Sequence, residues 1–191
     1  MERVVYCTAS VSGSTLARSD QATYIHALES SRSVDIVEYG NFVERVNSGP
    51  LATKGSRGRP QLVEPSQLPT SITTPGIWVT GGMIMVSYSR REEKGSDVNV
   101  ASNLLVDLYE DRIDAALVIS NDSDLEFAVK MARTKIPVGI VNPTKAYLAG
   151  KLKVAPNFGA GRHFSMQLTP AHFTENQLPD PVGSFRKPVG W

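Results

Sequence analysis

Two aspartates, Asp122 and Asp124, stand two residues apart in the segment SNDSD at 120–124, directly after the apolar run at 115–119. Two carboxylates at short range raise each other's pKa unless a positive charge lies between them. A divalent cation such as Mg²⁺ or Mn²⁺ removes this repulsion, because it prefers hard oxygen ligands. The spacing therefore favours a metal site at the mouth of a strand. The structural alternative is that Asp122 or Ser123 caps the helix that follows.

A second acidic element has the sequence EEKGSDVN at 92–99. Gly95 lets the chain turn, and a helix is expected to begin at Ser96 or Asp97. Asp97 would then stand at the carboxyl edge of the preceding strand. Its structural alternative is a favourable charge against the helix dipole, worth ~0.3–1 kcal/mol. Further acidic residues lie roughly 15 Å or more along this helix and are expected to be surface charges: Asp107, Glu110 and Asp111.

Hydrophobic periodicity indicates which elements position these residues. We expect strands at 4–6, 34–37, 83–87, 115–119 and 137–141, and helices at 20–30, 96–109 and 125–134. This alternation predicts an α/β protein with an open, mainly parallel sheet and helices on both faces. Ligands of such sheets bind beyond the carboxyl ends of the strands, and Asp122 and Asp124 follow one of those ends.

The 191 residues, 41% of them hydrophobic, are enough for one domain with an appendage. We expect this domain to span 1–169. Its Pro- and Gly-rich part, 47–82, is expected to be a long loop excursion with one short strand at 77–80. The densest cationic spot there is Lys54, Arg57 and Arg59, for which a solvated loop is favoured over a binding patch. Residues 170–191 are expected to form an extended tail packed on the domain.

Charge and composition exclude several classes of protein. Lys plus Arg (20) nearly balance Asp plus Glu (19), for a net charge of +1. This balance excludes a polybasic arm as the main source of nucleic-acid affinity, although a local groove can still be basic. The single cysteine, Cys7, excludes an internal disulfide framework and a Cys-rich zinc cluster. No stretch approaches 18 apolar residues and no signal-peptide core is present, so we expect a cytoplasmic protein without a membrane partner.

The sequence EKGSDV at 93–98, followed by ALVISNDSDL at 116–125, resembles the NYN family of PIN-like nucleases. The segment IPVGIV at 136–141 is similar to that family's next strand, and QLPDPV at 177–182 is similar to the tail of actinobacterial members. The resemblance covers 1–144 without the Pro- and Gly-rich excursion. It implies a PIN/NYN-like fold and a divalent-metal-dependent ribonuclease that hydrolyses RNA phosphodiester bonds.

The resemblance also implies roles for particular residues. The catalytic carboxylates that hold Mg²⁺ or Mn²⁺ would be Asp97, Asp122 and Asp124. The residues that flank the RNA substrate would be Lys94, Asn121 and Ser123. The implied reaction is metal-assisted in-line attack of hydroxide on phosphorus.

The chain departs from this family at its start. Members begin with a strand that is central in the sheet and ends in an Asp, whereas 1–9 resembles the family's second strand. We therefore expect the first strand to be missing: the natural protein begins further upstream, another segment fills the gap, or the site is impaired. Loss of one acidic ligand weakens metal affinity, and an open slot leaves unpaired backbone groups. Such an exposed edge would allow a homodimer.

Three functions follow from these observations. The first is a metal-dependent ribonuclease, and the second is a catalytically impaired NYN-fold module that binds RNA or protein. The third, a flavodoxin-like or HAD-like phosphatase, needs an Asp nucleophile at the end of the first strand, where this chain has Thr8, Ala9 and Ser10. The histidines show no metal-ligand spacing and are expected at the surface or partly buried: His26, His163 and His172.

Overall fold

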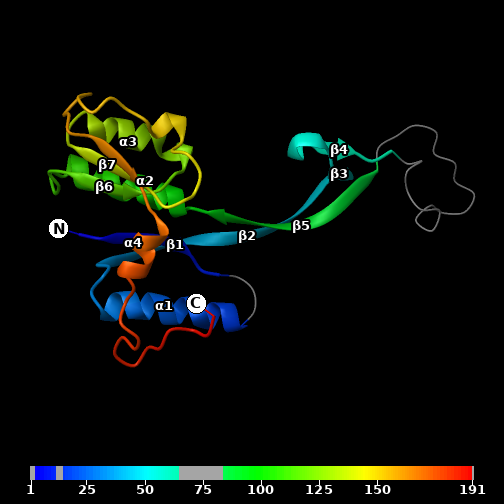
Figure 1. Cartoon of the computed structure of the whole chain (residues 1–191), viewed down its shortest axis with the longest axis horizontal. Coiled ribbons are helices and arrows are strands. Elements are labelled where there is room, and N and C mark those ends of the chain that lie inside the picture. The colour runs from blue at the N-terminus through cyan, green and yellow to red at the C-terminus, as the bar shows by residue number, and fades with distance from the viewer. Residues whose placement is uncertain (1–2, 12–14, 65–83, 191) are drawn as a thin grey trace, which may run out of the picture. The chain divides into compact units, whose positions relative to one another are not determined.

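The computed structural model describes residues 3–11, 15–64 and 84–190 and has a mixed α/β fold (Figure 1). The chain divides into two compact units: unit 1 is Met1–Phe42 with Glu93–Trp191, and unit 2 is Val43–Glu92. The strands are β1 (Val5–Ala9), β2 (Ile36–Pro50), β3 (Ala52–Lys54), β4 (Pro60–Leu62), β5 (Met85–Lys94), β6 (Ala116–Ile119), β7 (Val138–Asn142) and β8 (Phe164–Gln167). The α-helices are α1 (Thr15–Ser30), α2 (Ser96–Tyr109), α3 (Glu126–Arg133) and α4 (Pro170–Glu175).

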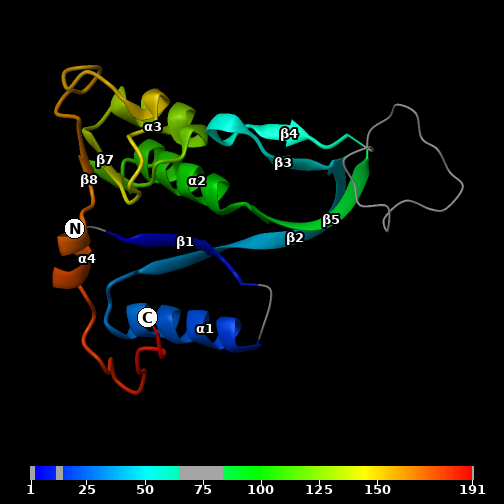
Figure 2. The same ribbon diagram turned by 45° about the vertical axis from the view of Figure 1, so that its right-hand side comes forward.

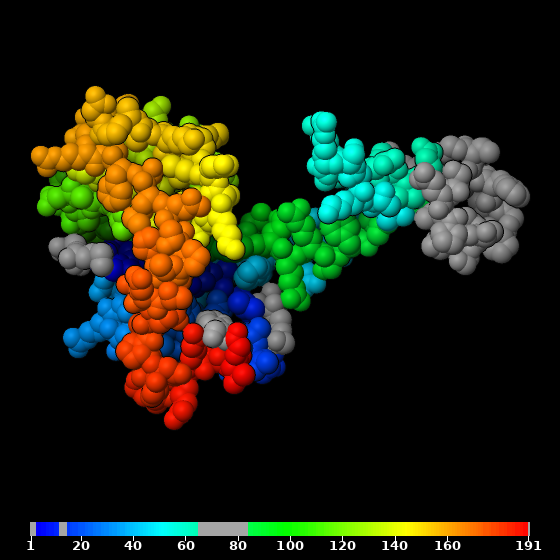
Figure 3. All heavy atoms as spheres, viewed as in Figure 1, coloured from blue at the N-terminus to red at the C-terminus, as the bar shows by residue number. Residues whose placement is uncertain are grey.

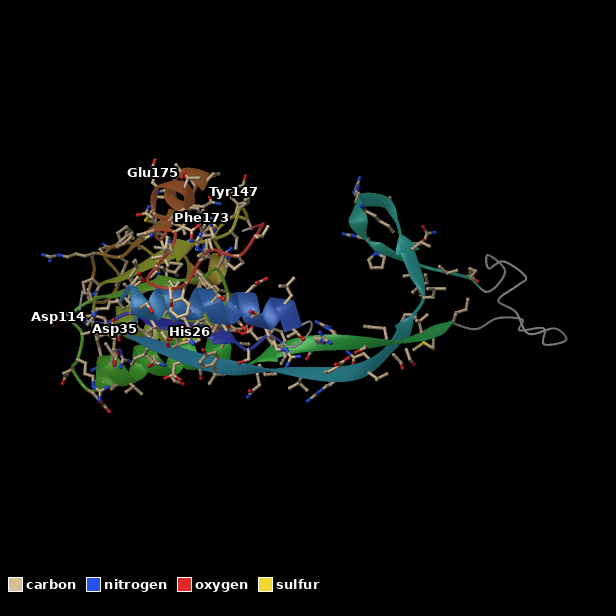
Figure 4. All side chains as sticks on the ribbon, turned by 90° about the horizontal axis from the view of Figure 1, so that it is seen from below. His26, Asp35, Asp114, Tyr147, Phe173 and Glu175 are labelled. Carbon is tan, nitrogen blue, oxygen red and sulfur yellow. The ribbon has the colours of Figure 1, made fainter. Side chains whose placement is uncertain are left out.

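The predicted α/β class is confirmed, and the parallel pairing occurs in two places. β1 and β2 pair in parallel across the crossover helix α1, with Val5 opposite Ile36. β6, β7 and β8 form a second sheet in which both pairings are parallel. Figure 4 shows Asp35, just before β2, and Asp114, just before β6, at the same end of unit 1. The strands of both sheets therefore point their carboxyl ends in the same general direction.

The prediction of one open sheet was wrong for the described residues. The strand orders are β1-β2-β5 and β6-β7-β8, so β1 and β6 are edges of separate sheets. The physical reason is that no described strand lies between them to carry the hydrogen-bond ladder from one sheet to the other. In a single continuous sheet, β1 and β6 would lie near the centre. Here each of them is instead the edge strand of its own sheet.

The main core joins α2 and α3 to one face of the β6–β8 sheet. Leu104 and Leu108 of α2 share this core with Val118 of β6 and with Val129 of α3. β7 is buried along its whole length because it is the central strand of its sheet. Helix α1 and helix α2 lie on opposite faces of β1 and β2, as Figures 1 and 2 show.

Several predicted elements differ from the observed ones at their ends. The helix expected at 20–30 begins five residues earlier, and the strand expected at 34–37 continues to Pro50. The predicted helix at 96–109 is confirmed residue for residue. Strand β8 and helix α4 were missed. The residues of β8 were missed because all four are exposed, so they show no clear core-facing pattern.

Unit 2 contains strand structure where a loop was expected. The described part of the range 47–82 includes the end of β2, the β3–β4 hairpin and a short 3₁₀ turn at Ser56–Gly58. The loop expected at the described positions of this range was therefore wrong, and the strand predicted at 77–80 lies outside the described residues. The hairpin pairs Ala52 with Leu62 in antiparallel register. Backbone pairing in the hairpin, which needs no apolar periodicity, explains why the sequence pattern did not reveal it.

The C-terminal segment packs on the rest of unit 1, as Figure 3 shows for the orange and red residues. His26 of α1 stacks against Phe185 at 5.3 Å between ring centroids. A cavity of about 500 Å³ lies between α1 and this segment, with Tyr24, Leu28 and Phe173 in its lining. Among the residues that the structure describes, no helix is both long and apolar enough to cross a membrane.

Candidate functional site

The turn that carries Asp97 depends on two glycines. Gly95 has φ = 98°, a left-handed conformation that glycine adopts without strain, and it caps the start of α2. Gly40 of β2 passes so close to this turn that a Cβ there would lie 2.6 Å from the Lys94 carbonyl oxygen and 2.8 Å from the Ser96 hydroxyl. Close passage of β2 thus fixes the turn, and Asp97 follows as the second residue of α2.

The turn that carries Asp122 and Asp124 is organised by its own side chains. The Asp122 carboxylate accepts a hydrogen bond of 2.9 Å from the Asp124 backbone amide and caps the 3₁₀ turn Ser123–Leu125. The Ser120 hydroxyl accepts one of 3.1 Å from the Asp122 amide. The capping alternative is therefore confirmed for Asp122. A cap uses one carboxylate oxygen, so the other remains free to face a ligand.

The carboxylates of Asp122 and Asp124 act electrostatically on Asp97. Partial burial is the largest cause that raises the pKa of Asp97 above its usual value, and the negative charges of Asp122, Glu93 and Asp124 raise it further. The start of α2 and the end of β6 are thus brought together, although 25 residues separate Asp97 from Asp122. The structure places these negative charges where each opposes the ionisation of Asp97.

Glu38 and Glu93 belong to the same acidic region and were not predicted as site residues. Burial, followed by the charges of Glu38 and Asp97, raises the pKa of the Cys7 thiol. Glu38 lies directly opposite Cys7 in the β1–β2 pairing. The sequence signal for Glu38 was a charged residue between apolar neighbours in a strand. Its relevance depends on the register of β1 and β2, which no local pattern contains.

Asn121, predicted to flank a substrate, forms hydrogen bonds with the loop that follows β7. Its amide nitrogen donates to the Tyr147 carbonyl at 3.1 Å and to the Thr144 hydroxyl at 3.4 Å. Its amide oxygen accepts from the Ala149 backbone at 2.8 Å. These bonds tie the loop after β7 to the end of β6. Tyr147 itself is 96% exposed.

The two other predicted substrate residues lie at the same turns. Ser123 is the first residue of the 3₁₀ turn, half-buried beside Asp122. Lys94 is the last residue of β5, exposed and three residues before Asp97. All six predicted residues thus belong to the β5–α2 turn or the turn after β6, although the structure does not test their roles.

The donor set has the chemistry that a hard divalent cation requires. Carboxylate oxygens are the ligands that Mg²⁺ and Mn²⁺ prefer, and the mutual repulsion around Asp97 is what such a cation would relieve. In the part of the chain that the structure describes, no three His, Cys, Asp or Glu side chains stand close enough together to hold one ion as they are. Side-chain movement at these exposed turns would therefore have to accompany metal binding.

Comparisons with known proteins gave no match to a family model, to a curated protein or to a solved structure.

Proposed function

We propose that this chain is a divalent-metal-dependent ribonuclease that hydrolyses RNA phosphodiester bonds. The observation that carries the proposal is the electrostatic meeting of Asp97 with Asp122 and Asp124 at the carboxyl ends of parallel strands. Ligand sites of open α/β sheets form at such ends. The sequence resemblance to the NYN family supports the same assignment, with a PIN/NYN-like fold as part of the proposal.

The ligands of Mg²⁺ or Mn²⁺ in this proposal are Asp97, Asp122 and Asp124. When bound, the cation supplies a Lewis acid that lowers the pKa of a water molecule and balances charge on the scissile phosphate. The repulsion that Asp122 and Asp124 exert on Asp97 would be relieved by the shared ion, which favours its binding at these carboxylates. Asp122 keeps its turn in place through the cap that it forms with the Asp124 amide.

Two features of the chain support RNA as the substrate. Tyr147 is anchored to the acidic turn through its carbonyl, and its exposed ring offers a face on which an unpaired base can stack. Unit 2 holds six Lys and Arg and three Asp and Glu, so its net charge is +3. Since the whole chain has a net charge of +1, unit 1 has a net charge of −2. Its hairpin presents Lys54, Arg57 and Arg59 to solvent, where they can contact phosphates.

A labelled single-stranded RNA incubated with the full chain tests this proposal. We expect cleavage with Mn²⁺ or Mg²⁺ and none with EDTA. Asp122→Asn should lower the rate by at least about 100-fold, because an amide oxygen still caps the turn but no longer carries charge. Asp114→Asn is the matched control, since Asp114 precedes β6 at the opposite end of the strand. Unchanged metal-dependent cleavage by Asp122→Asn would refute the assignment.

The second candidate is a catalytically impaired NYN-fold module that binds RNA or protein. It is favoured by the lack of any ready three-residue metal group among the described side chains. This function predicts RNA binding that EDTA does not change and no cleavage with either metal. The cleavage assay and a binding assay on the same RNA therefore separate the two candidates.

A further inference from the structure

Strands β2 and β5 form a two-stranded ribbon in unit 2. The two strands are neighbours in their sheet, and Figure 2 shows them side by side. The Leu51 amide donates to the Ile84 carbonyl at 2.8 Å, and the Ser48 and Ser87 hydroxyls lie 3.1 Å apart. These contacts define an antiparallel register in which Leu51 lies opposite Ile84 and Ser48 lies opposite Ser87.

This register divides the side chains of the ribbon, residues 43–50 and 85–92, between two faces, because successive residues of a strand point to opposite sides. A Cβ atom at Gly49 would lie 3.7 Å from the Tyr88 ring, in agreement with their assignment to one face. We call this face the arginine face, since each strand contributes one arginine to it. Its members are Val43, Arg45, Asn47, Gly49, Val86, Tyr88, Arg90 and Glu92.

The charges on the other face of the ribbon are balanced. Glu44 lies opposite Arg91 and pairs with it at 3.6 Å. The Glu44 carboxylate also accepts a hydrogen bond of 2.6 Å from the Ser89 hydroxyl. This hydrogen bond, and then the charge of Arg91, lower the pKa of Glu44. Opposite charges thus meet across the two strands on this face.

Like charges meet across the strands on the arginine face. Arg45 lies directly opposite Arg90, and the Cβ atoms of such a pair are about 4.5–5.5 Å apart, where like charges destabilise the pairing. The Nε atom of Arg90 pairs with Glu92 at 3.3 Å. Arg45 has no ion pair and no side-chain hydrogen bond with any residue that the structure describes. The arginine face therefore has two positive charges and one negative charge, a net charge of +1.

Burial does not compensate for this repulsion. None of the residues 43–50 and 85–92 is buried, and Tyr88 is 47% exposed. A two-stranded ribbon without a covering layer is only marginally stable in water. An anionic ligand between the two arginines would remove their repulsion and add contacts to the ribbon.

We propose that the arginine face binds single-stranded RNA, with Arg45 and Arg90 on a phosphate and the Tyr88 ring stacked on a neighbouring base. Guanidinium groups bind phosphates through charge-assisted hydrogen bonds that are often bidentate. Tyr88 lies two residues from Arg90 in the same strand, roughly 7 Å away. Gly49 has no side chain that could cover the Tyr88 ring. Because every base has a face that can stack, this site selects unpaired RNA without selecting its sequence.

The proposed function supplies RNA as the identity of the ligand, and the inference rests on it in this respect. A phosphate ion would use only the arginines, and an acidic peptide offers no flat base to the Tyr88 ring. The cationic hairpin of the same unit, with Lys54, Arg57 and Arg59, favours a ligand with several phosphates. RNA is the ligand that uses the arginines, the aromatic ring and the hairpin together.

The test uses the full chain in EDTA, so that RNA is bound without metal-dependent cleavage. The probe is a fluorescein-labelled oligouridylate of about 12 nucleotides, and fluorescence anisotropy measures its affinity. An abasic phosphodiester strand of the same length keeps the phosphates and lacks the bases. We expect the RNA to bind at least about tenfold more tightly than the abasic strand. Tyr88→Ala should reduce this difference at least about fivefold, whereas Tyr88→Phe, which keeps the ring, should retain it.

Arginine variants test the phosphate contact. Arg45→Gln should weaken RNA binding and lower the slope of log affinity against log salt by about 0.7. Arg91→Gln is the matched control, because it removes the same charge from the other face, and it should change the slope less. Arg45→Glu places opposite charges across the ribbon, so amide exchange along the ribbon should slow while RNA binding weakens at least about tenfold. This opposite movement of stability and affinity separates a lost contact from a lost fold.

Several results would overturn the proposal. These are no RNA binding by the wild type, equal binding of the RNA and the abasic strand, or wild-type affinity in Tyr88→Ala. Equal salt slopes for Arg45→Gln and Arg91→Gln would also overturn it, as would displacement of the probe by polyglutamate as effectively as by unlabelled RNA. Cleavage after addition of Mn²⁺ is scored separately. Binding that depends on the ribbon without cleavage contradicts the ribonuclease alone, and cleavage with normal binding by the ribbon variants contradicts this inference alone.

Discussion

The side-chain amide of Asn121 donates a hydrogen bond of 3.1 Å to the backbone carbonyl of Tyr147, and its oxygen accepts one of 2.8 Å from Ala149. One residue before Asp122, the chain is thus tied to the loop that follows β7. This link makes the geometry of the acidic turn depend on a segment more than twenty residues away.

Asn121→Ala removes these two bonds and the longer one to the Thr144 hydroxyl, and it should lower the free energy of unfolding by about 1–3 kcal/mol, since each hydrogen bond contributes about 1 kcal/mol. Urea denaturation measures this change. Asn176→Ala serves as the control, because the exposed Asn176 amide donates to the His172 carbonyl, which lies only four residues away in the chain. Equal stability of the two variants would show that the Asn121 link does not hold the turn.

The cationic hairpin of unit 2 should contribute to RNA affinity through phosphate contacts. Replacing Lys54, Arg57 and Arg59 together by Gln should weaken RNA binding and reduce the slope of log affinity against log salt by about 0.7 per lost contact. Fluorescence anisotropy over a series of KCl concentrations measures both quantities. A matched triple variant in unit 1, at Arg32, Lys130 and Lys135, should change the slope less. The same slope in the hairpin variant and the wild type would exclude the hairpin from RNA contact.

The raised pKa of Asp97 should appear as a pH dependence of stability. Above its usual pKa of 3.8, the folded chain retains a proton on Asp97 that the unfolded chain has lost. The free energy of unfolding should therefore fall as the pH rises from about 4 through the raised pKa of Asp97. The stability that the Asp97 proton contributes is complete at low pH and is lost above the raised pKa.

Thermal unfolding without divalent metal, over pH 4–7, measures this dependence. Asp97→Asn cannot titrate and should flatten the fall in stability, whereas Asp114→Asn should retain it. The effect should stay within about 1 kcal/mol, because solvent screens exposed charges. An identical pH profile for wild type and Asp97→Asn would contradict the electrostatic description of the site.

The sequence predicted the local elements of unit 1 better than their assembly. The apolar spacing at 96–109 predicted α2 residue for residue, and the apolar runs predicted β6 and β7 to within one residue at each end. These patterns arise from burial against neighbouring elements, so they appear in the sequence itself. The division into two sheets depends on which strands pair, and single-strand patterns do not contain that information.

The candidate site shows the same limit. The turns that carry Asp97 and Asp122 were predicted, because Gly95 and the SNDSD segment have distinct local signatures. Glu38 was missed because only the pairing of β1 with β2 brings it opposite Cys7 and into the acidic region. The hydrogen bonds of Asn121 to the 144–149 loop were not predicted, because they arise from tertiary packing, and its substrate contact stays a prediction.

The claim that Asp97, Asp122 and Asp124 share one divalent ion is tested most directly by calorimetric titration of Mn²⁺ into the full chain. We predict saturable binding of about one ion per chain, with affinity at least about tenfold weaker in each of the three Asp→Asn variants, since each loses a charged oxygen ligand. Asp114→Asn should bind like the wild type. Unchanged Mn²⁺ affinity in the three variants, or no saturable binding by the wild type, would contradict the metal site.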